Sequence, residues 1–332
     1  MIQYVFRNRK AGYSIAKVFN TFIPNIDNYE KLELPFARAS LLCVLQNALY
    51  LIRHKRKGAL YHLTGNVEYC ALVLPKKRTI LTIHDLVLLN HNKYGKIKKL
   101  VFFYLWHYYP LKRAGIITCI SEKTRNDLLH FFPWANHKVV VIPNPVDPAI
   151  KYFKKAFNKQ NPVILHVGTR ENKNLERVAE ALSGIKCVLR VVGEMTESQI
   201  KIMDKYRIEY ENVHNLSDEE IRDEYYKSDI ISFPSTYEGF GMPIVEGYAA
   251  GRIVVTSNIS PMIDIAEDAS IFVNPFDTNS IREGFLHAIE ADEERDTMIE
   301  KGLHIAQKYS AHIIANQYQT LYEQLLRCQC HC

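Results

Sequence analysis

Two glutamates, Glu238 and Glu246, stand eight positions apart on either side of a short glycine-containing loop. The loop follows an apolar run that predicts a buried strand, and it precedes a segment, 243–250, that predicts a short helix. Gly239 and Gly241 are expected to allow φ > 0 and a close approach of the backbone to a ligand. Unpaired amides at the helix start favour a phosphate, whereas the carboxylates would accept hydrogen bonds from hydroxyl groups. A diphosphate flanked by a ribose and a hexose, as in a nucleotide-sugar, satisfies both requirements.

A second loop carries positive charge. It spans residues 166–174, follows the predicted strand 162–167, and contains Gly168, Arg170 and Lys173. Two cations in such a loop could neutralise a diphosphate through charge-assisted hydrogen bonds. The alternative in both loops is a plain turn whose charged side chains are solvated.

The elements that must position these loops alternate along the N-terminal half. Short β-rich runs predict strands at 2–6, 59–63, 79–83, 115–119 and 138–142. Helical periodicity marks 14–22, 37–55, 96–109 and 122–132. An alternation of strand and helix predicts a parallel sheet with helices on both faces.

The pattern breaks at Pro145 and Pro148, and the charged stretch 151–160 that follows reads as a linker between domains. Beyond it, further strands are expected at 162–167, 187–192, 229–233 and 252–256. Asn174 is a candidate N-cap, and Ser217 with Glu220 predicts a capping box. The fold class is therefore predicted to be α/β, with two Rossmann-like doubly wound domains. Ligands of such sheets bind at the carboxyl ends of strands, where both charged loops are expected.

The run E-G-F-G-M-P-I-V-E over residues 238–246 resembles the E-x7-E signature of the family 4 glycosyltransferases of the bacterial group 1 type. The resemblance implies the GT-B fold, in which two such domains face each other across a cleft. It gives Glu238 a contact with the donor sugar and Glu246 one with the ribose, with Gly239, Phe240 and Gly241 contributing backbone contacts. Residues 166–174 are similar to the phosphate-binding segment of the family. Its Arg and Lys usually lie farther apart, which puts Lys173 in more doubt than Arg170.

In the N-terminal half, T-I-H-D-L over residues 82–86 resembles another family segment, which implies a place for His84 at the reacting centre against the donor sugar. A satisfied structural histidine is the alternative. Residues 7–15 stand where the family has a glycine-rich acceptor loop, so Gly12 and Tyr13 are expected at the acceptor. The implied domains are 1–150 for the acceptor and 151–310 for the donor, with 311–332 as a helix that could pack back on the first. Pro145 replaces the usual glycine of the hinge.

The resemblance further implies a hexosyl transfer with retention at the anomeric carbon, without a metal or other cofactor. The chain has no Asp-x-Asp pair in a suitable loop, in agreement with that expectation. A covalent intermediate would need a carboxylate nucleophile, and none stands out in the N-terminal half. Attack by the acceptor from the face of the leaving group is therefore favoured. The acceptor would be a saccharide or a lipid-linked saccharide, in the biosynthesis of a surface polysaccharide or glycan.

Composition limits the partners. The 332 residues are 47% hydrophobic and carry a net charge of +6, which favours anionic partners without choosing among them. No nucleic-acid motif is visible, so no nucleic-acid partner is expected. The odd number of cysteines, seven, argues for a reducing compartment, and a metal clip at residues 328–332 is disfavoured by its spacing. No signal peptide or membrane span is visible, which predicts a cytoplasmic protein. Residues 93–113 are basic and aromatic, so contact with the inner-membrane surface is an alternative to simple burial.

Two other readings stay open. A nucleotide-sugar epimerase uses the same fold and would isomerise the donor without an acceptor. A degenerate, non-catalytic binding protein would explain the departures at Pro145 and in the acceptor loop.

Overall fold

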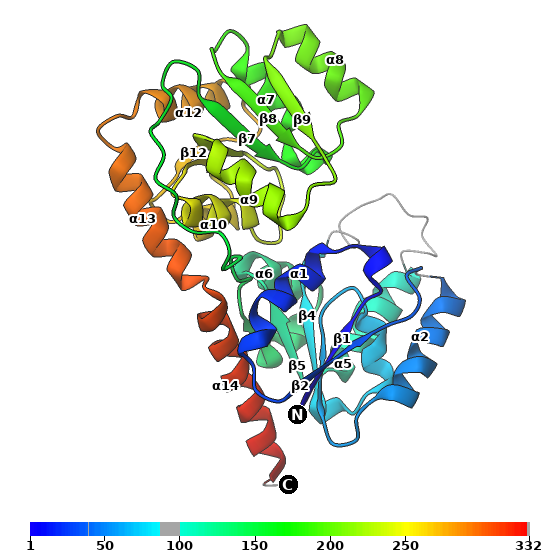
Figure 1. The fold of residues 1–332 in the computed structure, drawn as a ribbon. Coiled ribbons are helices and arrows are strands. Elements are labelled where there is room, and N and C mark those ends of the chain that lie inside the picture. The colour runs from blue at the N-terminus through cyan, green and yellow to red at the C-terminus, as the bar shows by residue number, and fades with distance from the viewer. Residues whose placement is uncertain (39, 87–99, 331–332) are drawn as a thin grey trace. The chain divides into compact units, whose positions relative to one another are not determined.

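The computed structural model describes residues 1–38, 40–86 and 100–330, with side chains up to residue 327. The cysteine-rich group at 328–332 therefore lies outside the described side chains. Internal contacts divide the chain into two compact units, drawn in Figure 1. Unit 1 comprises Met1–Pro145 together with Ala311–Cys332, and unit 2 comprises Val146–Ser310.

Unit 1 is built on a six-stranded sheet in which every strand pair is parallel. The order is β2-β1-β3-β4-β5-β6. Five of these strands fall where apolar runs predicted them, whereas β2 was missed. The bounds are β1 Ile2–Phe6, β2 Tyr29–Glu33, β3 Leu60–Leu63, β4 Thr79–Ile83, β5 Ile116–Cys119 and β6 Val139–Val141.

Helices cover both faces of this sheet (Figure 1). The predicted helix 96–109 lies partly outside the described residues, and its described part includes a π-helical stretch, η5. The α-helices are α1 Ser14–Phe22, α2 Leu41–His54, α5 Tyr109–Arg113, α6 Glu122–Phe131 and α14 Ala311–Cys330. The other helical segments are η1 Arg9–Ala11, η2 Ile23–Asn25, η3 Glu68–Val73, η4 Lys76–Arg78, η5 Phe103–Tyr108 and η6 Pro133–Lys138.

The C-terminal helix α14 belongs to the core of unit 1. Its Tyr318 and Tyr322 are buried against β1, α1 and η2. The Tyr322 hydroxyl lies 2.6 Å from His62 Nδ1 and 2.9 Å from the Tyr4 hydroxyl. His62 Nε2 in turn lies 2.7 Å from the Thr82 hydroxyl. A buried polar network therefore ties the last helix of the chain to three strands of the first sheet.

Unit 2 is built on a second parallel sheet, with the order β12-β11-β10-β7-β8-β9. The strands β7, β8, β10 and β11 fall within one residue of the predicted bounds, whereas β9 and β12 were not predicted. The bounds are β7 Val163–Val167, β8 Val188–Val192, β9 Tyr210–Val213, β10 Ile230–Phe233, β11 Ile253–Ser257 and β12 Ile271–Val273.

The helices of unit 2 show the expected amphipathic pattern. On α7, for example, Leu175, Val178 and Leu182 are buried. The capping box of Ser217 and Glu220 is confirmed at the start of α9. The helical segments are η7 Glu171–Lys173, α7 Leu175–Leu182, α8 Glu197–Tyr206, α9 Asp218–Lys227, α10 Met242–Ala250, α11 Met262–Ala266, α12 Thr278–Glu290 and α13 Arg295–Lys308.

Each sheet contains one point at which the chain reverses its direction of strand addition. In unit 1 it lies between β1 and β3, because β2 is added on one side of β1 and the later strands on the other. In unit 2 it lies between β7 and β10 for the same reason. Loops that leave the carboxyl ends of these strands diverge and leave room for a ligand. These two points are where binding residues are expected.

Candidate active site

The two charged loops of the sequence meet at the reversal point of unit 2. Lys173 Nζ lies 2.6 Å from Glu238 Oε1, and the two side chains are only 19% and 15% exposed. Asn172 Nδ2 donates to Glu238 Oε1 at 3.1 Å and to the carbonyl of Tyr237 at 2.9 Å. The Thr236 amide donates back to the Asn172 carbonyl at 2.9 Å. The loop after β7 thereby holds the loop after β10 in place.

The backbone after β7 explains how Lys173 reaches this position. Gly168 has φ +98°, and a Cβ on it would lie 3.0 Å from Lys173 Cγ, so the lysine stem packs over a bare backbone. Asn174 has φ +67° in the left-handed region, which asparagine tolerates. Asn174 is the N-cap residue of α7, as predicted, but its side chain makes no capping hydrogen bond. Asn174 Nδ2 donates instead to the carbonyls of Pro234 and Pro275, at 3.0 and 2.7 Å. It therefore anchors the start of the second loop as well.

Glu246 lies one turn inside α10, as predicted, and Pro243 lies in the first turn of that helix. The buried Tyr225 hydroxyl donates to Glu246 Oε2 at 2.7 Å. Burial, and then the negative charge of Glu246, raise the pKa of Tyr225 well above its usual range. The phenol therefore stays a hydrogen-bond donor, and it fixes the orientation of the carboxylate.

The glycine loop itself differs in one respect from expectation. Gly241 has φ 168°, which is extended backbone and not the left-handed conformation that was predicted. Its lack of a side chain still matters, because a Cβ would lie 3.1 Å from Ile244 Cδ1. The side chain of Phe240 is buried and packs edge-on against Tyr309, with ring centroids 5.6 Å apart. The side chain therefore belongs to the packing of unit 2, and the backbone contact with the donor that the resemblance implied stays a prediction.

Arg170 is exposed at the tip of the β7 loop, three residues before the partly buried Lys173. The two cations thus occupy different environments. Beneath them His166 lies buried, with Nδ1 3.1 Å from the Ser232 hydroxyl. Burial, reinforced by the charge of Lys173, lowers the pKa of His166 to about 3. It therefore adds no charge to the site at neutral pH.

In unit 1 the structure places His84 directly after β4, over the bare backbone of Gly65. A Cβ on Gly65 would lie 2.5 Å from the His84 ring. His84 Nε2 lies 2.7 Å from the Thr64 carbonyl, which can only accept, so Nε2 carries the proton. Burial lowers the pKa of His84 below its usual value, which keeps the ring neutral. Nδ1 is left as a hydrogen-bond acceptor, suited to a hydroxyl group.

The two residues predicted for the acceptor follow η1 in unit 1. Gly12 has φ +130°, and Tyr13 is exposed. A Cβ on Gly12 would lie 2.6 Å from Arg7 Nη2, so the glycine allows the loop to close over that guanidinium.

Sequence reasoning missed two residues of the unit 2 site, Asn172 and Tyr225. Each acts on a glutamate that is distant in the chain, and neither lies in a motif of its own. Asn172 lies in the segment 166–174 that resembles the phosphate-binding segment, but its contact with Glu238 was not predicted. Tyr225 lies in α9, where no local pattern points to Glu246.

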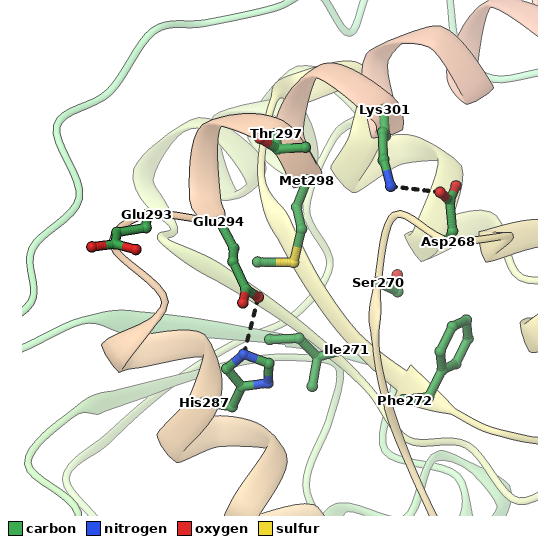
Figure 2. A pocket seen from close by; sticks show the side chains of 10 residues that line it. All are labelled: Asp268, Ser270, Ile271, Phe272, His287, Glu293, Glu294, Thr297, Met298 and Lys301. Atoms are coloured by element: carbon green, nitrogen blue, oxygen red, sulfur yellow. Dashed lines mark hydrogen bonds and ion pairs between the residues drawn. The ribbon is translucent and has the colours of Figure 1, made fainter.

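A cavity of about 460 Å³ lies elsewhere in unit 2, beside the edge strand β12 and the facing ends of α12 and α13 (Figure 2). An ion pair joins Lys301 to Asp268 at its rim, and His287 lies 3.3 Å from Glu294. None of the predicted site residues lines it. Within the part of the chain that the structure describes, no group of three or more His, Cys, Asp or Glu side chains could hold a metal ion.

Two doubly wound parallel sheets, with charged and glycine-bearing loops at the reversal point of the second, are the architecture of GT-B glycosyltransferases. The chain belongs to the group 1, family 4 glycosyltransferases and is a glycosyltransferase. The family described as "Glycosyl transferases group 1" matches residues 149–304, and the one described as "Glycosyltransferase Family 4" matches residues 31–150.

Curated relatives include O-antigen chain mannosyltransferase B of Escherichia coli, which is 22% identical over 89% of this chain and 84% of that protein. The GDP-mannose:cellobiosyl-diphosphopolyprenol alpha-mannosyltransferase of Komagataeibacter xylinus is 31% identical, but over 38% of this chain and 32% of that protein. Among solved structures, HepE of Anabaena, in complex with UDP and glucose, has a TM-score of 0.76 at 14% identity. It covers 97% of this chain and 99% of its own.

The likeness to HepE establishes the fold. The matches give no support to the epimerase reading. No described helix has the length and apolar character needed to cross a membrane.

Proposed function

We propose that this glycosyltransferase transfers a sugar from a nucleotide-diphosphate sugar to a saccharide or lipid-linked acceptor, with retention at the anomeric carbon. The observation that carries the proposal is the contact between Lys173 and Glu238 at the reversal point of unit 2. A diphosphate needs a cation and a hexose needs a hydrogen-bond acceptor, and here the two lie side by side.

Each donor residue then has a distinct task. Arg170, Lys173 and the N-terminus of α10 bind the diphosphate. Glu238 accepts hydrogen bonds from the sugar, and Glu246, oriented by Tyr225, accepts them from the ribose. Gly168, Gly239, Phe240 and Gly241 supply a backbone that a ligand can approach.

The first donor to test is GDP-mannose, because the curated relatives named above are mannosyltransferases. By the same reasoning the acceptor is a growing saccharide, free or on a polyprenyl diphosphate, and the pathway is the biosynthesis of a surface polysaccharide. Nucleic acid is not a partner in this proposal.

In the reaction, the bond between the anomeric carbon and the diphosphate oxygen breaks, and the nucleoside diphosphate leaves with the bonding electrons. The acceptor oxygen attacks from the same face, and its proton passes to the departing phosphate. The charge that develops on the leaving group falls on Arg170, Lys173 and the amides of α10, so a metal ion is not required. His84 accepts a hydrogen bond from a hydroxyl of the transferred sugar through Nδ1.

The test is transfer and donor binding by the purified protein. GDP-mannose, UDP-glucose and related donors are screened for acceptor-dependent nucleotide release. Arg170→Ala and Glu246→Ala should each abolish transfer while the protein stays folded; Arg170→Ala should leave thermal unfolding unchanged, and Glu246→Ala should lower the stability only modestly, through the lost hydrogen bond from Tyr225. Arg9→Met, which removes one side of an exposed ion pair with Glu33 in unit 1, is the control and should keep full activity. Equal rates in the wild type and both site variants would overturn the proposal.

We also propose that unit 1 contacts an anionic membrane surface. The predicted segment 93–113 is described only from residue 100, where Leu100, Val101, Tyr104 and Tyr109 are exposed. The helix α2 exposes a second apolar stripe, Leu41, Leu42, Leu45, Leu49 and Ile52. Exposed Arg53 and Lys57 follow it. Exposed apolar residues beside basic ones fit the boundary between acyl chains and anionic headgroups.

Vesicle sedimentation tests the membrane proposal. The wild type should sediment with vesicles that contain phosphatidylglycerol, and the double variant Leu45→Glu, Leu49→Glu should stay in the supernatant. Leu286→Glu in unit 2, where the leucine is 41% exposed, controls for the effect of an added surface charge. Equal sedimentation of all three proteins would refute a role for α2.

A further inference from the structure

A second candidate binding site lies at the reversal point of unit 1. Arg7 directly follows β1, and Glu68 begins η3, which follows β3. These strands flank the point where the direction of strand addition reverses, as β7 and β10 do in unit 2. Side chains at the carboxyl ends of such strands are placed to meet a ligand. His84, at the end of the neighbouring β4, interacts electrostatically with both Arg7 and Asp85.

Both residues keep an unused hydrogen-bonding atom at this place. Glu68 is 5% exposed, and its Oε1 accepts from the Asn66 amide at 2.9 Å. Its Oε2 is buried without a hydrogen-bond partner in the described structure, and so is Arg7 Nε. Buried polar atoms are nearly always hydrogen-bonded. An unsatisfied donor and an unsatisfied acceptor at the same reversal point indicate a ligand that forms hydrogen bonds with both.

The loop after Arg7 holds the guanidinium in position. Gly12 lets η1 close over it, and Asn8 anchors that loop through hydrogen bonds from Nδ2 to the carbonyls of Leu34 and Pro35, at 3.1 and 3.0 Å. The neighbouring Arg9 is engaged in an exposed pair with Glu33. Arg7 is therefore the arginine of this loop that is oriented toward the interior of the site.

The charges decide what kind of ligand fits. The Arg7 guanidinium interacts electrostatically with Glu68, and the pKa of Glu68 is raised to about 7 by burial first and then by the negative charge of Asp85. An anion such as a phosphate would be repelled by these carboxyl groups. A neutral polyol is suited, since its hydroxyl oxygens accept from a guanidinium and its hydroxyl hydrogens are donated to a carboxyl oxygen.

We propose that Arg7 and Glu68 bind hydroxyl groups of the acceptor saccharide and so determine which acceptor is used. The inference rests on the proposed transferase function. It assigns the acceptor subsite to Arg7, the first residue of the segment that stands in the place of the acceptor loop, and to Glu68, which no motif marked. Arg7 donates through Nε, Glu68 accepts through Oε2, and Gly12 acts on the acceptor by positioning Arg7.

The experiment separates acceptor binding from donor binding. Methyl α-mannoside and other methyl glycosides serve as acceptor probes, and nucleotide release from the donor is followed as their concentration rises. Arg7→Met and Glu68→Gln should each raise the half-saturating glycoside concentration by roughly tenfold or more, the loss of a hydrogen bond to a charged group. The affinity for GDP and the donor hydrolysis without acceptor should stay within about twofold, because those depend on unit 2. Arg9→Met is the matched control and should change none of these values.

Arg7→Lys is the control for misfolding. It keeps the positive charge and should bind the glycoside with an affinity between those of the wild type and Arg7→Met. A wild type that binds no nucleotide would refute the transferase function itself. A wild type that binds nucleotide but responds to no glycoside would overturn the saccharide subsite alone. Three other results would also overturn the saccharide subsite. The variants could keep the half-saturating glycoside concentration of the wild type, they could lose GDP affinity in parallel, or pyrophosphate could compete with the glycoside in the wild type but not in Arg7→Met.

Discussion

Replacement of Lys173 by methionine tests whether this lysine binds the donor or only supports Glu238. Methionine keeps most of the stem that packs over Gly168 but removes the ammonium group. In the structure that group lies 2.6 Å from Glu238 Oε1 and 4.8 Å from the centre of the Phe233 ring. Both interactions are lost, so unit 2 must lose some stability whatever the function of the lysine.

The loss of stability can be bounded. Removal of one partner from a fully buried ion pair costs about 3–5 kcal/mol. Glu238 is 15% exposed and keeps the Asn172 amide at 3.1 Å, so about 2 kcal/mol is expected. For a domain of this size that lowers the melting temperature by roughly 4–8 °C. If Lys173 also contacts the diphosphate, the affinity for GDP falls by a further factor of roughly 10 to 150, the equivalent of about 1.5–3 kcal/mol.

Calorimetric titration with GDP and scanning calorimetry of unfolding measure the two effects separately. Glu238→Gln removes the carboxylate charge and releases Lys173, so GDP affinity should hold or rise while transfer is lost. The double variant Lys173→Met, Glu238→Gln should recover most of the stability, since neither charge is left unpaired, but should not recover GDP binding. Lys301→Met breaks an exposed pair with Asp268 and controls for loss of one surface cation.

One result would refute the reasoning. If the double variant binds GDP as tightly as the wild type, Lys173 acts only through Glu238, and the diphosphate depends on Arg170 and the start of α10.

Three further outcomes are expected. Tyr225→Phe should weaken donor binding about fivefold and cost about 1 kcal/mol of stability, because Glu246 loses its 2.7 Å hydrogen bond; GDP titration and calorimetry would show it, and unchanged affinity would contradict it. Gly65→Ala should impair transfer more than GDP binding, because residue 65 has φ +117° and a Cβ there displaces the His84 ring. Transfer kinetics equal to those of the wild type would show that His84 has no part in the reaction. As the pH falls below 6.5, the wild type should lose about 1.4 kcal/mol of stability per pH unit, because burial lowers the pKa of His62 from 6.5 to about 3 and only the unfolded chain is then protonated there. His62→Asn should not show this loss, so the difference in stability between the two proteins should narrow. Tryptophan fluorescence, which reports unit 1 alone, measures it, and a constant difference would disprove the prediction.

The central strands of both sheets and the apolar edge strand β6 could be predicted from the sequence, whereas the edge strands β2, β9 and β12 could not. Apolar runs such as residues 230–233 are buried on both faces, so they stand out against the polar sequence around them. The edge strand β2 has the sequence YEKLE and only one buried residue, Leu32. Likewise β9 is YENV without a buried residue. Such strands are defined by pairing with a neighbour, which no local pattern records.

The site was predictable to the extent that its chemistry is local. Glu238 and Glu246 were found because a strand, a glycine loop and a helix start follow one another in the chain. The contact of Lys173 with Glu238 spans 65 residues, and that of Tyr225 with Glu246 joins two helices. Arg7 was marked only as part of the segment in the place of the acceptor loop, and Glu68 lies in no motif; the strand order is what places the two at one point. Long-range contacts of this kind follow from topology rather than from spacing.

The pair of Lys173 and Glu238 also resolves an electrostatic difficulty in the sequence. Carboxylates next to a phosphate site should repel the phosphate, yet two of them flank the loop. In a nucleotide-sugar the diphosphate is bonded directly to the anomeric carbon, so the group that needs a cation and the group that needs an acceptor are neighbours. A lysine within 2.6 Å of a glutamate offers both at that spacing, and the lysine offsets the charge that would otherwise repel the ligand. The bond to be broken would then lie beside this pair, where the ammonium group can stabilise the departing phosphate oxygen. Glu246 accepts a hydrogen bond from Tyr225 and, in this proposal, faces the ribose rather than the diphosphate.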